Sequence, residues 1–335
     1  MTPPASTAVY SRDRALYPQD RVLLVCNPTA GARHRVTELE DLKHRLESRG
    51  LIAEFVTDLE QLASLSASLE QAGRLRVVIA CGGDGTVAEV VNRVGERVPV
   101  TVYPMGTANL LAGYLGIPRD AASMTRLVAD EGVVTRLDAG RANGRLFLLM
   151  VSCGFDADVV RRLHTRRRGR HITYFTWTQP IIEAMRSYTY PVLRVKCTAP
   201  DGSEPTSQRT HWAFAVNLPV YAAGLSVAPE ARADDGHLHV CTFHGGSLWH
   251  GIKHVGHVLL RRHKRLPEYK CEVATQVRIE ADEPVPYQLD GDPGGMLPLD
   301  IEILPGRVTL LVPPAAAHRH ELTIIQTQAQ GVPPR

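Results

Sequence analysis

The segment Cys81–Asn92, CGGDGTVAEVVN, places three glycines around one aspartate directly after the apolar run Arg76–Ala80. Ligands of open α/β sheets bind at the carboxyl ends of the strands. Glycines there let the backbone turn sharply, and their N–H groups can surround a phosphate. Asp84 cannot bind phosphate directly, but its carboxylate can bind the Mg²⁺ that accompanies a nucleotide. The segment therefore has two interpretations, a nucleotide site or a tight turn between a strand and a helix.

Two further glycine-containing loops favour the nucleotide site. Asn27–Gly31 (NPTAG) follows an apolar strand predicted over 21–26, and Pro104–Ala112 (PMGTANLLA) follows a strand predicted over 98–104. Carboxyl ends of parallel strands share one edge of a sheet, so these loops are expected beside Cys81–Asn92. Three polar loops at one edge indicate a phosphate site more strongly than a single motif does.

The elements that position these loops alternate between strand and helix in the first half of the chain. This alternation predicts a parallel sheet wrapped by helices. Gly50 and Gly73 are natural helix terminators. The predicted strands are 21–26, 51–57, 74–80 and 98–104, and the predicted helices are 36–50, 58–73, 86–95 and 106–117.

The second half has the pattern of an antiparallel β-rich domain. Asn143-Gly144 lies between apolar flanks, which is a strong hairpin signal. Strand-like segments are predicted at 190–197, 211–218, 237–244, 271–281 and 297–313, with helical segments at 172–188 and 248–265. The predicted domains are a loose N-terminal extension (1–20), an α/β domain (21–138), a β-rich domain (139–313) and a polar C-terminal tail (314–335). The sequence leaves open whether the end of the β-rich segment returns to the α/β domain.

Composition and charge exclude several classes of protein. The chain has 335 residues, 44% hydrophobic and 22% charged, with a net charge of +3, which gives no sequence-wide field for binding nucleic acid. No apolar run approaches the ~18 residues of a membrane span, and the N-terminus lacks a secretory signal. The six scattered cysteines indicate free thiols rather than a disulfide framework or a zinc site, and the histidines show no metal-ligand spacing. We therefore expect a cytoplasmic protein.

Seven motifs in order make the sequence resemble the diacylglycerol kinase catalytic family, the bacterial lipid kinases related to sphingosine and ceramide kinases. The resemblance covers about residues 20–313 and rests on NPTAG, GGDGT, PMGTAN, LDAG, GFDA, APEARADDGHLHV and LDGD. GGDGT is shared with NAD kinases, whereas the later motifs favour the lipid kinases. The resemblance implies an ATP- and Mg²⁺-dependent transfer of a phosphoryl group to a lipid hydroxyl. It also implies a nucleotide cleft between the α/β domain and the β-rich domain.

The resemblance further implies the residues that bind the nucleotide. Backbone N–H groups at a helix N-terminus favour anions, and threonine hydroxyls add neutral donors. The implied residues are Asn27, Pro28, Gly31, Thr57, Gly82, Gly83, Asp84, Gly85, Thr86, Val87, Ala88, Glu89, Gly106, Thr107 and Asn109. Asp84 would also act in catalysis, by orienting the phosphates through Mg²⁺. Asp138 would be a further carboxylate near this network.

The family's metal site and catalytic base are expected in the second half. The match places Mg²⁺ on the Asp235 carboxylate and on the backbone carbonyls of Arg232 and His237. Oxygen ligands suit this hard cation, although Asp234-Asp235-Gly236 also has the composition of a simple turn. The base that accepts the lipid hydroxyl proton would be Asp292 or Asp290, with Asp292 slightly favoured.

Three positions depart from the usual family pattern. Asp292 stands where the family usually has glutamate, Leu110 where many members have aspartate, and Ala88 where asparagine is usual. A phosphate cradle made of backbone groups would survive these changes. They direct attention to a lipid alcohol other than diacylglycerol, or to an altered activity.

Two other functions stay open beside the lipid kinase. An NAD kinase would share the GGDGT loop, but the segment GTANLLAGYLG is apolar where adenosine-recognising polar pairs are needed. A protein that binds nucleotide or lipid without catalysis is the second. The sequence leaves open whether the chain forms a homodimer and which lipid it phosphorylates.

A lipid substrate would require transient visits to the inner membrane surface, and two segments have a composition that bears on this role. Arg161–Trp177 combines a basic run with aromatics, and lipid docking and a solvated helix face fit it equally. For Lys253–Arg265 the pattern favours a solvated helix with core contacts.

Overall fold

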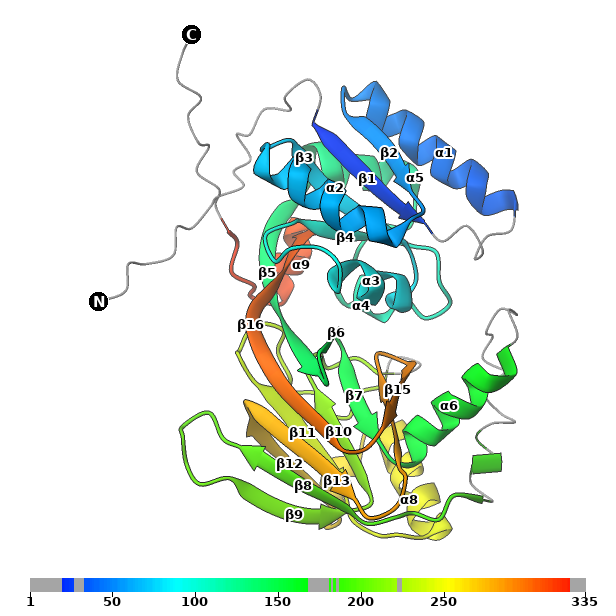
Figure 1. Ribbon diagram of the computed structural model, residues 1–335, viewed down its shortest axis with the longest axis vertical. Coiled ribbons are helices and arrows are strands. Elements are labelled where there is room, and N and C mark those ends of the chain that lie inside the picture. Colours follow the sequence, from blue (N-terminus) through cyan, green and yellow to red (C-terminus); the bar gives the residue numbers. More distant parts are fainter. Residues whose placement is uncertain are drawn as a thin grey trace. The chain divides into compact units, whose positions relative to one another are not determined.

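The computed structural model describes residues 20–26, 33–167, 181, 183–184, 187–221 and 225–325 (Figure 1). The chain divides into two compact units. Of the described residues, those up to 137 and from 306 onward form the first unit, and those from 138 to 305 form the second. Two strands, β5 (Val133–Ala142) and β16 (Leu299–Val312), run from one unit into the other.

The first unit is built on a parallel sheet. Its strands follow the order β2-β1-β3-β4, and the end of β16 continues this order beside β4, with Leu310 opposite Val100. The strands are β1 (Arg21–Cys26), β2 (Ile52–Val56), β3 (Leu75–Gly82) and β4 (Val100–Pro104). The helices are α1 (Arg33–Ser48), α2 (Leu59–Gln71), α3 (Asp84–Val91), α4 (Leu110–Tyr114), α5 (Ala121–Arg126) with the π-helix η2 (Leu127–Glu131), and α9 (Pro314–Arg319).

Apolar strand centres explain why this sheet forms. Every residue from Val22 to Val25 and from Val77 to Ala80 is buried, as expected for parallel strands covered on both faces. Helix α2 begins where the Asp58 side chain accepts a hydrogen bond from the Glu60 N–H group. The predicted α/β fold of this half is confirmed.

The second unit contains two antiparallel layers that enclose a common core. The start of β16 continues through β13, β8 and β9, and the other sheet follows the order β12-β11-β10-β7-β14-β15. The core between them includes Val151, Val195, Ala215, Val240 and Ile279. The strands are β6 (Arg145–Phe147), β7 (Met150–Cys153), β8 (Leu193–Thr198), β9 (Thr206–Thr210), β10 (Trp212–Val216), β11 (Leu238–Phe243), β12 (Tyr269–Ala274), β13 (Gln276–Ala281), β14 (Pro286–Leu289) and β15 (Asp292–Met296). The helices are α6 (Phe155–Arg167), α8 (Leu248–Leu259) and the 3₁₀-helix η5 (His263–Arg265).

Several elements of the second unit differ from the sequence predictions. The β-rich antiparallel class is confirmed, and the hairpin at Asn143-Gly144 forms with both residues at positive φ. Segment 271–281 is not one strand, because Thr275 separates β12 from β13 and the two belong to different sheets. Helix α6 was missed, and most of the helix predicted over 172–188 lies outside the described residues.

Helix α8 ends earlier than the predicted helix over 248–265. Arg261 adopts a left-handed conformation (φ 54°), with its N–H group donating to the carbonyl of Val258, and Arg262 donates to the carbonyl of His257. This pair of bonds is a Schellman motif, which ends a helix by turning the chain back over its last turn. The segment after Leu260 therefore leaves the helix axis.

Helix α8 packs on an aromatic cluster through a buried histidine. His254 has no exposed surface, and its ring centroid lies 5.0 Å from that of Phe243 and 5.6 Å from that of Trp212. Neither ring nitrogen has a hydrogen-bond partner within the described part of the chain. Burial lowers the pKa of His254 to about 4.

Because His254 is buried in its neutral form, we expect the protein to lose stability in mild acid. The unfolded chain binds the proton near pH 6.5, and the folded chain binds it only near pH 4. The stabilising contribution is therefore complete above pH 6.5 and is lost as the pH falls toward 4, by about 2 kcal/mol at pH 5. Urea unfolding at pH 7.5 and pH 5 should show a smaller difference for His254→Leu than for the wild type. In the control His44→Leu, which changes an exposed histidine, the difference between the two pH values should equal that of the wild type. If His254→Leu also shows the wild-type difference, His254 is not the group responsible.

Candidate active site residues in the two units

The two described glycine loops start at neighbouring positions of the first unit's sheet. Strands β3 and β4 are parallel neighbours, with Gly82 opposite Pro104 at their carboxyl ends. The N–H group of Met105 donates to the carbonyl of Gly82 over 2.9 Å and ties the start of the second loop to the end of β3. The predicted meeting of these loops at one sheet edge is therefore seen in the structure.

The loops touch backbone to backbone at a pair of glycines. A Cβ atom built on Gly106 would lie 2.6 Å from the Cα of Gly83 and 2.7 Å from Oδ1 of Asn109. Asn109 clamps this turn, because its Oδ1 accepts from the Gly106 N–H group and its Nδ2 donates to the Gly106 carbonyl, both over 2.8 Å. Asn109 does so in a left-handed conformation, which asparagine tolerates better than most residues. These contacts hold the two loops as one rigid unit.

Substitution of Gly106 should disrupt this unit. We expect Gly106→Ala to destabilise the protein by about 1–3 kcal/mol, because a methyl group meets backbone atoms that cannot move independently. ATP binding should weaken in parallel, as measured by isothermal titration calorimetry. The matched control is Gly113→Ala in α4, where a methyl group meets nothing within 4 Å and stability should stay equal or rise. Equal behaviour of the two variants would contradict the role of the close approach.

Asp84 connects the first loop to helix α4. Its carboxylate accepts hydrogen bonds from the N–H groups of Leu110 and Leu111, each over 3.0 Å. These donors are among the first N–H groups of α4, which have no acceptors within the helix. Asp84 therefore caps α4 from another element, in a contact that depends on the backbone and not on the side chain of Leu110.

The remaining predicted nucleotide residues differ in what they can offer a ligand. Gly85 lies in the first turn of α3, whose first N–H groups have no acceptor within the helix. The N–H group of Thr86 already donates to the carbonyl of Gly83 over 3.0 Å, so Thr86 could offer a ligand its hydroxyl group. Val87 and Ala88 are buried, so they could contribute backbone atoms alone, and Glu89 pairs with Arg93. Thr57 and Thr107 are exposed, at the ends of β2 and β4. Asn27, Pro28 and Gly31 lie outside the described residues.

In the second unit, Asp138 anchors the loop that carries the predicted metal ligands. Its N–H group donates to the carbonyl of Ala233 over 2.7 Å, and its carboxylate accepts from the N–H group of Gly236 over 2.6 Å. The Asp138 carbonyl accepts from Nδ2 of Asn217 over 3.0 Å. The LDAG and ADDG motifs therefore meet through hydrogen bonds.

Asp235 offers a carboxylate that is already partly engaged. Its Oδ1 accepts from the N–H group of His237 over 3.0 Å, and its Oδ2 lies 3.6 Å from Nε2 of His239. Burial acts to raise the pKa of Asp235, but the bonds from His239 and His237 outweigh it and the net pKa is lowered. An ionised carboxylate is a ligand of the kind that a hard divalent cation prefers.

Asp290 and Asp292 have clearly different surroundings. The Asp290 carboxylate accepts from the N–H groups of Leu148, Leu149 and Met150 over 2.7–2.9 Å. Asp290 also forms, with Gly291, the two-residue turn between β14 and β15, and both residues have positive φ. This turn has the Asp-Gly composition typical of type I′ hairpins. The side chain of Asp290 therefore holds the backbone in place.

Asp292 lies at the start of β15 with a side chain that reaches solvent. It is 31% exposed, and its two carboxylate oxygens lie 3.8 Å from Nη2 of Arg145 and 3.5 Å from Nε2 of His164. Within the described residues, no backbone N–H group donates to this carboxylate. Both aspartates are partly exposed, but the Asp290 carboxylate is occupied by three backbone N–H groups, whereas the neighbours of the Asp292 carboxylate are side chains.

A buried polar cluster beside this hairpin was not assigned a role from the sequence. Asp156, at the start of α6, accepts hydrogen bonds from Ser152, Tyr221 and Gln288. Burial raises the pKa of Asp156, and these hydrogen bonds offset part of the rise. Asp156 belongs to the GFDA motif, so the motif was the signal. The cluster ties α6 to β7 and β14, next to the turn that carries Asp290.

A second group of potential ligands was also missed. Glu230, His239 and Cys271 place one ligand atom each within 4.8 Å of one another, and Sγ of Cys241 lies 3.1 Å from Sγ of Cys271. Their sequence spacing gave no indication, because they come from a loop and from two paired strands. All six cysteines are free thiols.

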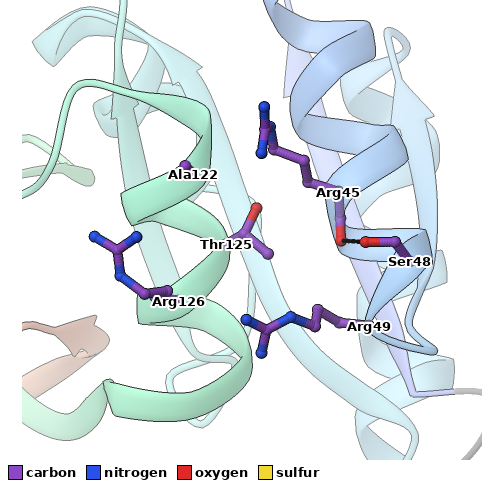
Figure 2. Close-up of a pocket in the computed structure, with 6 residues that line it drawn as sticks. All are labelled: Arg45, Ser48, Arg49, Ala122, Thr125 and Arg126. Atoms are coloured by element: carbon purple, nitrogen blue, oxygen red, sulfur yellow. Dashed lines mark hydrogen bonds between the residues drawn. The ribbon is translucent and has the colours of Figure 1, made fainter.

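A cavity of about 200 Å³ lies between α1 and α5. None of the residues that line it is among the predicted site residues. Figure 2 shows three arginines around it, and the guanidinium group of Arg49 points toward α5. Each arginine has an acidic neighbour: Arg45 pairs with Asp41, Arg49 with Asp130 and Arg126 with Glu131. Paired, exposed arginines give no evidence of a bound anion.

Two family models match this chain, and one ends close to where the other begins. Residues 21–142 match the model of the diacylglycerol kinase catalytic domain. Residues 149–312 match the model of the YegS C-terminal NAD kinase beta sandwich-like domain. Both matches confirm the predicted fold of their halves.

Relatives cover almost the whole chain. A diacylglycerol kinase of Staphylococcus haemolyticus is 25% identical over 320 residues, which is 92% of this chain and 93% of the relative. A diacylglycerol kinase of Staphylococcus aureus is 27% identical over 304 residues, or 88% and 92% of the two chains. A solved Bacillus anthracis protein has a TM-score of 0.68 at 22% identity, over 92% of this chain and 100% of its own, which supports the fold.

Proposed function

Because the chain belongs to the diacylglycerol kinase catalytic domain family and is a phosphotransferase with an alcohol acceptor, we propose that it transfers the γ-phosphoryl group of ATP to a hydroxyl group of diacylglycerol or a related lipid alcohol. The observation that supports this most is the interlocked pair of glycine loops. It supplies backbone N–H groups at the carboxyl ends of parallel strands, where phosphates bind.

On the nucleotide side, the first turn of α3 would bind the phosphates. Gly83, Gly85 and Thr86 lie there, and Gly106, Thr107 and Asn109 form the adjoining turn. The fixed Gly83–Gly106 contact means that little reorganisation is needed when the phosphates arrive. The resemblance adds Asn27, Pro28, Gly31 and Thr57 to this set.

On the metal side, Asp235 and the carbonyls of Arg232 and His237 would hold Mg²⁺, and Asp84 would act near the phosphates. Bound Mg²⁺ supplies positive charge that neutralises phosphate oxygens during transfer. Asp138 keeps the Asp235 loop in place through Gly236. Asp84 keeps α4 in place beside the Gly106 turn, because its carboxylate accepts from the N–H groups of Leu110 and Leu111.

On the acceptor side, Asp292 would accept the proton of the lipid hydroxyl as the oxygen bonds to phosphorus. A carboxylate is a weak base in water, but here it need accept the proton only late in the reaction. Asp290 would position the hairpin that carries Asp292. The proposed roles of these two aspartates therefore differ.

The proposal is tested by transfer of labelled phosphate from ATP to lipids in neutral mixed micelles with Mg²⁺. The panel holds diacylglycerol, monoacylglycerol, sphingosine, ceramide and phosphatidylglycerol, with NAD as the soluble acceptor. We expect label in one lipid class and its loss in Asp84→Asn. Label in NAD alone would replace the lipid kinase by an NAD kinase. ATP binding without transfer to any acceptor would indicate a protein that has lost catalysis.

A further inference from the structure

Helix α8 exposes a run of apolar side chains, whereas the sequence of Lys253–Arg265 favoured a solvated helix with core contacts. Leu248, Ile252, Val255 and Leu259 recur at spacings of three and four residues, which puts them on one stripe of the helix. They are exposed by 42%, 43%, 41% and 58%. Trp249 (73%) and Leu260 (66%) flank the stripe and are exposed further still.

This stripe is not the side by which α8 joins the unit. Gly251 and His254 are the buried positions of the helix, and they face Tyr190, Trp212 and Phe243. The helix begins at an N-cap, where the Ser247 side chain accepts a hydrogen bond from the N–H group of His250. Six large apolar side chains on the free side of one short helix are more than isolated surface exposure, and such a patch marks an interaction surface.

A basic turn follows the apolar stripe directly. Arg261, Arg262 and Arg265 are exposed, and none of them forms an ion pair within the described part of the chain. Lys264 lies between them and pairs with Glu230. The Schellman motif fixes the position of this turn at the helix end, and it uses arginine at a left-handed position where glycine is usual.

We propose that the exposed face of α8, with the arginine turn that follows it, docks the protein on an anionic lipid surface. The apolar stripe would enter the boundary between headgroups and acyl chains, and the arginines would contact acidic headgroups. Exposed tryptophan suits this boundary, because its ring is apolar and its N–H group is polar. The inference rests on the proposed function for its biological purpose, but not for its physical evidence.

Charge favours a lipid surface over a second copy of the chain. A two-fold interface places the same patch on both partners, so the arginine turns would lie on both sides of it. Like charges across an interface are unfavourable, whereas acidic headgroups are complementary to them. The apolar face of a single short helix binds a lipid surface only weakly, and electrostatic attraction between the arginines and acidic headgroups strengthens that binding.

Sedimentation with lipid vesicles tests the docking directly. The full-length protein is mixed with vesicles of phosphatidylglycerol and phosphatidylcholine, or of phosphatidylcholine alone, at low and high salt. We expect binding to the anionic vesicles, weakening with salt, and a shift of tryptophan emission to shorter wavelength that is absent in Trp249→Phe. Failure of the wild type to bind anionic vesicles more tightly than neutral ones would overturn the proposal.

Two variants and one control separate docking from folding. Reversing charge in Arg261→Glu/Arg262→Glu should weaken vesicle binding by at least about tenfold. Trp249→Ser/Leu259→Ser should weaken it as well, with unchanged circular dichroism. Arg45→Glu/Arg126→Glu, at the cavity of Figure 2, makes the same change of net charge and should leave vesicle binding as it is. Equal weakening in that control, or a change of oligomeric mass in the α8 variants instead of vesicle binding, would refute the lipid-docking role.

Kinase activity distinguishes this proposal from the proposed function. With diacylglycerol in neutral detergent micelles, the α8 variants should transfer phosphate as the wild type does. With diacylglycerol in anionic vesicles, their rate should fall at least about tenfold, in step with binding. If the wild type binds vesicles through α8 but phosphorylates no lipid, the function fails and the docking stands. If it phosphorylates vesicle lipid and the α8 variants do so equally, the docking fails and the function stands.

Discussion

Asp84→Asn is expected to lower phosphoryl transfer by about a thousandfold, because it removes the charge that holds the two glycine loops together and that would act beside the metal. Asparagine keeps one acceptor oxygen, but it presents an NH₂ group where the second N–H donor of α4 now finds an oxygen. Steady-state rates with ATP and a micellar lipid acceptor measure the effect.

Asp84→Ala separates the structural from the chemical part of this role. It removes both acceptors and leaves two N–H groups of α4 without partners, which should cost about 2–4 kcal/mol of stability in urea unfolding. If ATP binding is also lost, loop positioning dominates. If ATP still binds and the dependence on Mg²⁺ changes, the metal role dominates.

The matched control for Asp84 is another aspartate at a helix start in the same unit. Asp120 accepts from the N–H group of Ser123 over 2.8 Å at the first turn of α5, away from the glycine loops. Asp120→Ala should cost about 1 kcal/mol of stability and leave phosphoryl transfer unchanged. Wild-type activity in Asp84→Asn would contradict both roles assigned to Asp84.

Local sequence signals predicted the first unit well, because apolar strands and glycine loops are local features. The buried runs of β1 and β3, and the glycines after β3, are visible in any short window. The hydrogen-bond partner of Asp84 is not visible in a short window, because Leu110 lies 26 positions away. Leu110 contributes its backbone N–H group, which every residue except proline has, so its side chain gives no signal. The absence of aspartate at Leu110 therefore says nothing about this contact.

The second unit was harder to predict because tertiary pairing decides its strands. A single residue, Thr275, divides one β-type segment between two sheets, and period-2 alternation does not mark such a break. Helix α6 carries a run of charged and small residues with a weak apolar pattern, so its packing against β7 and β14 could not be foreseen. The short hairpin at Asp290-Gly291 does carry a turn signal, because Asp-Gly is typical of type I′ turns, and the same residues belong to the LDGD motif.

Three aspartates of the kinase motifs share one physical role in this chain. Asp84, Asp138 and Asp290 each accept hydrogen bonds from backbone N–H groups of a distant segment. A charged acceptor makes such bonds strong, and it fixes the position of a loop without requiring any side chain opposite. A motif aspartate can therefore be essential for activity without touching the reacting atoms, and stability measurements must accompany kinetics.

Asp290 and Asp292 provide the sharpest test of this distinction. We expect Asp292→Asn to lower kcat by about 10²–10⁴-fold, as for loss of a general base, with a change in the free energy of unfolding below about 0.5 kcal/mol. Asp292→Glu, which restores the residue usual in the family, should retain more activity than Asp292→Asn.

Asp290→Asn should show the opposite pattern. Three backbone N–H groups lose a charged acceptor, so the free energy of unfolding should fall by about 2–4 kcal/mol. Asparagine still fits the left-handed turn, so the folded fraction should keep measurable kcat. Asp282→Asn, an exposed carboxylate paired with Arg194, is the control and should change neither quantity. A catalytic loss in Asp290→Asn at unchanged stability, with Asp292→Asn active, would transfer the role of base to Asp290. The three backbone bonds to Asp290, and the side-chain neighbours of Asp292, argue that the reverse will be found.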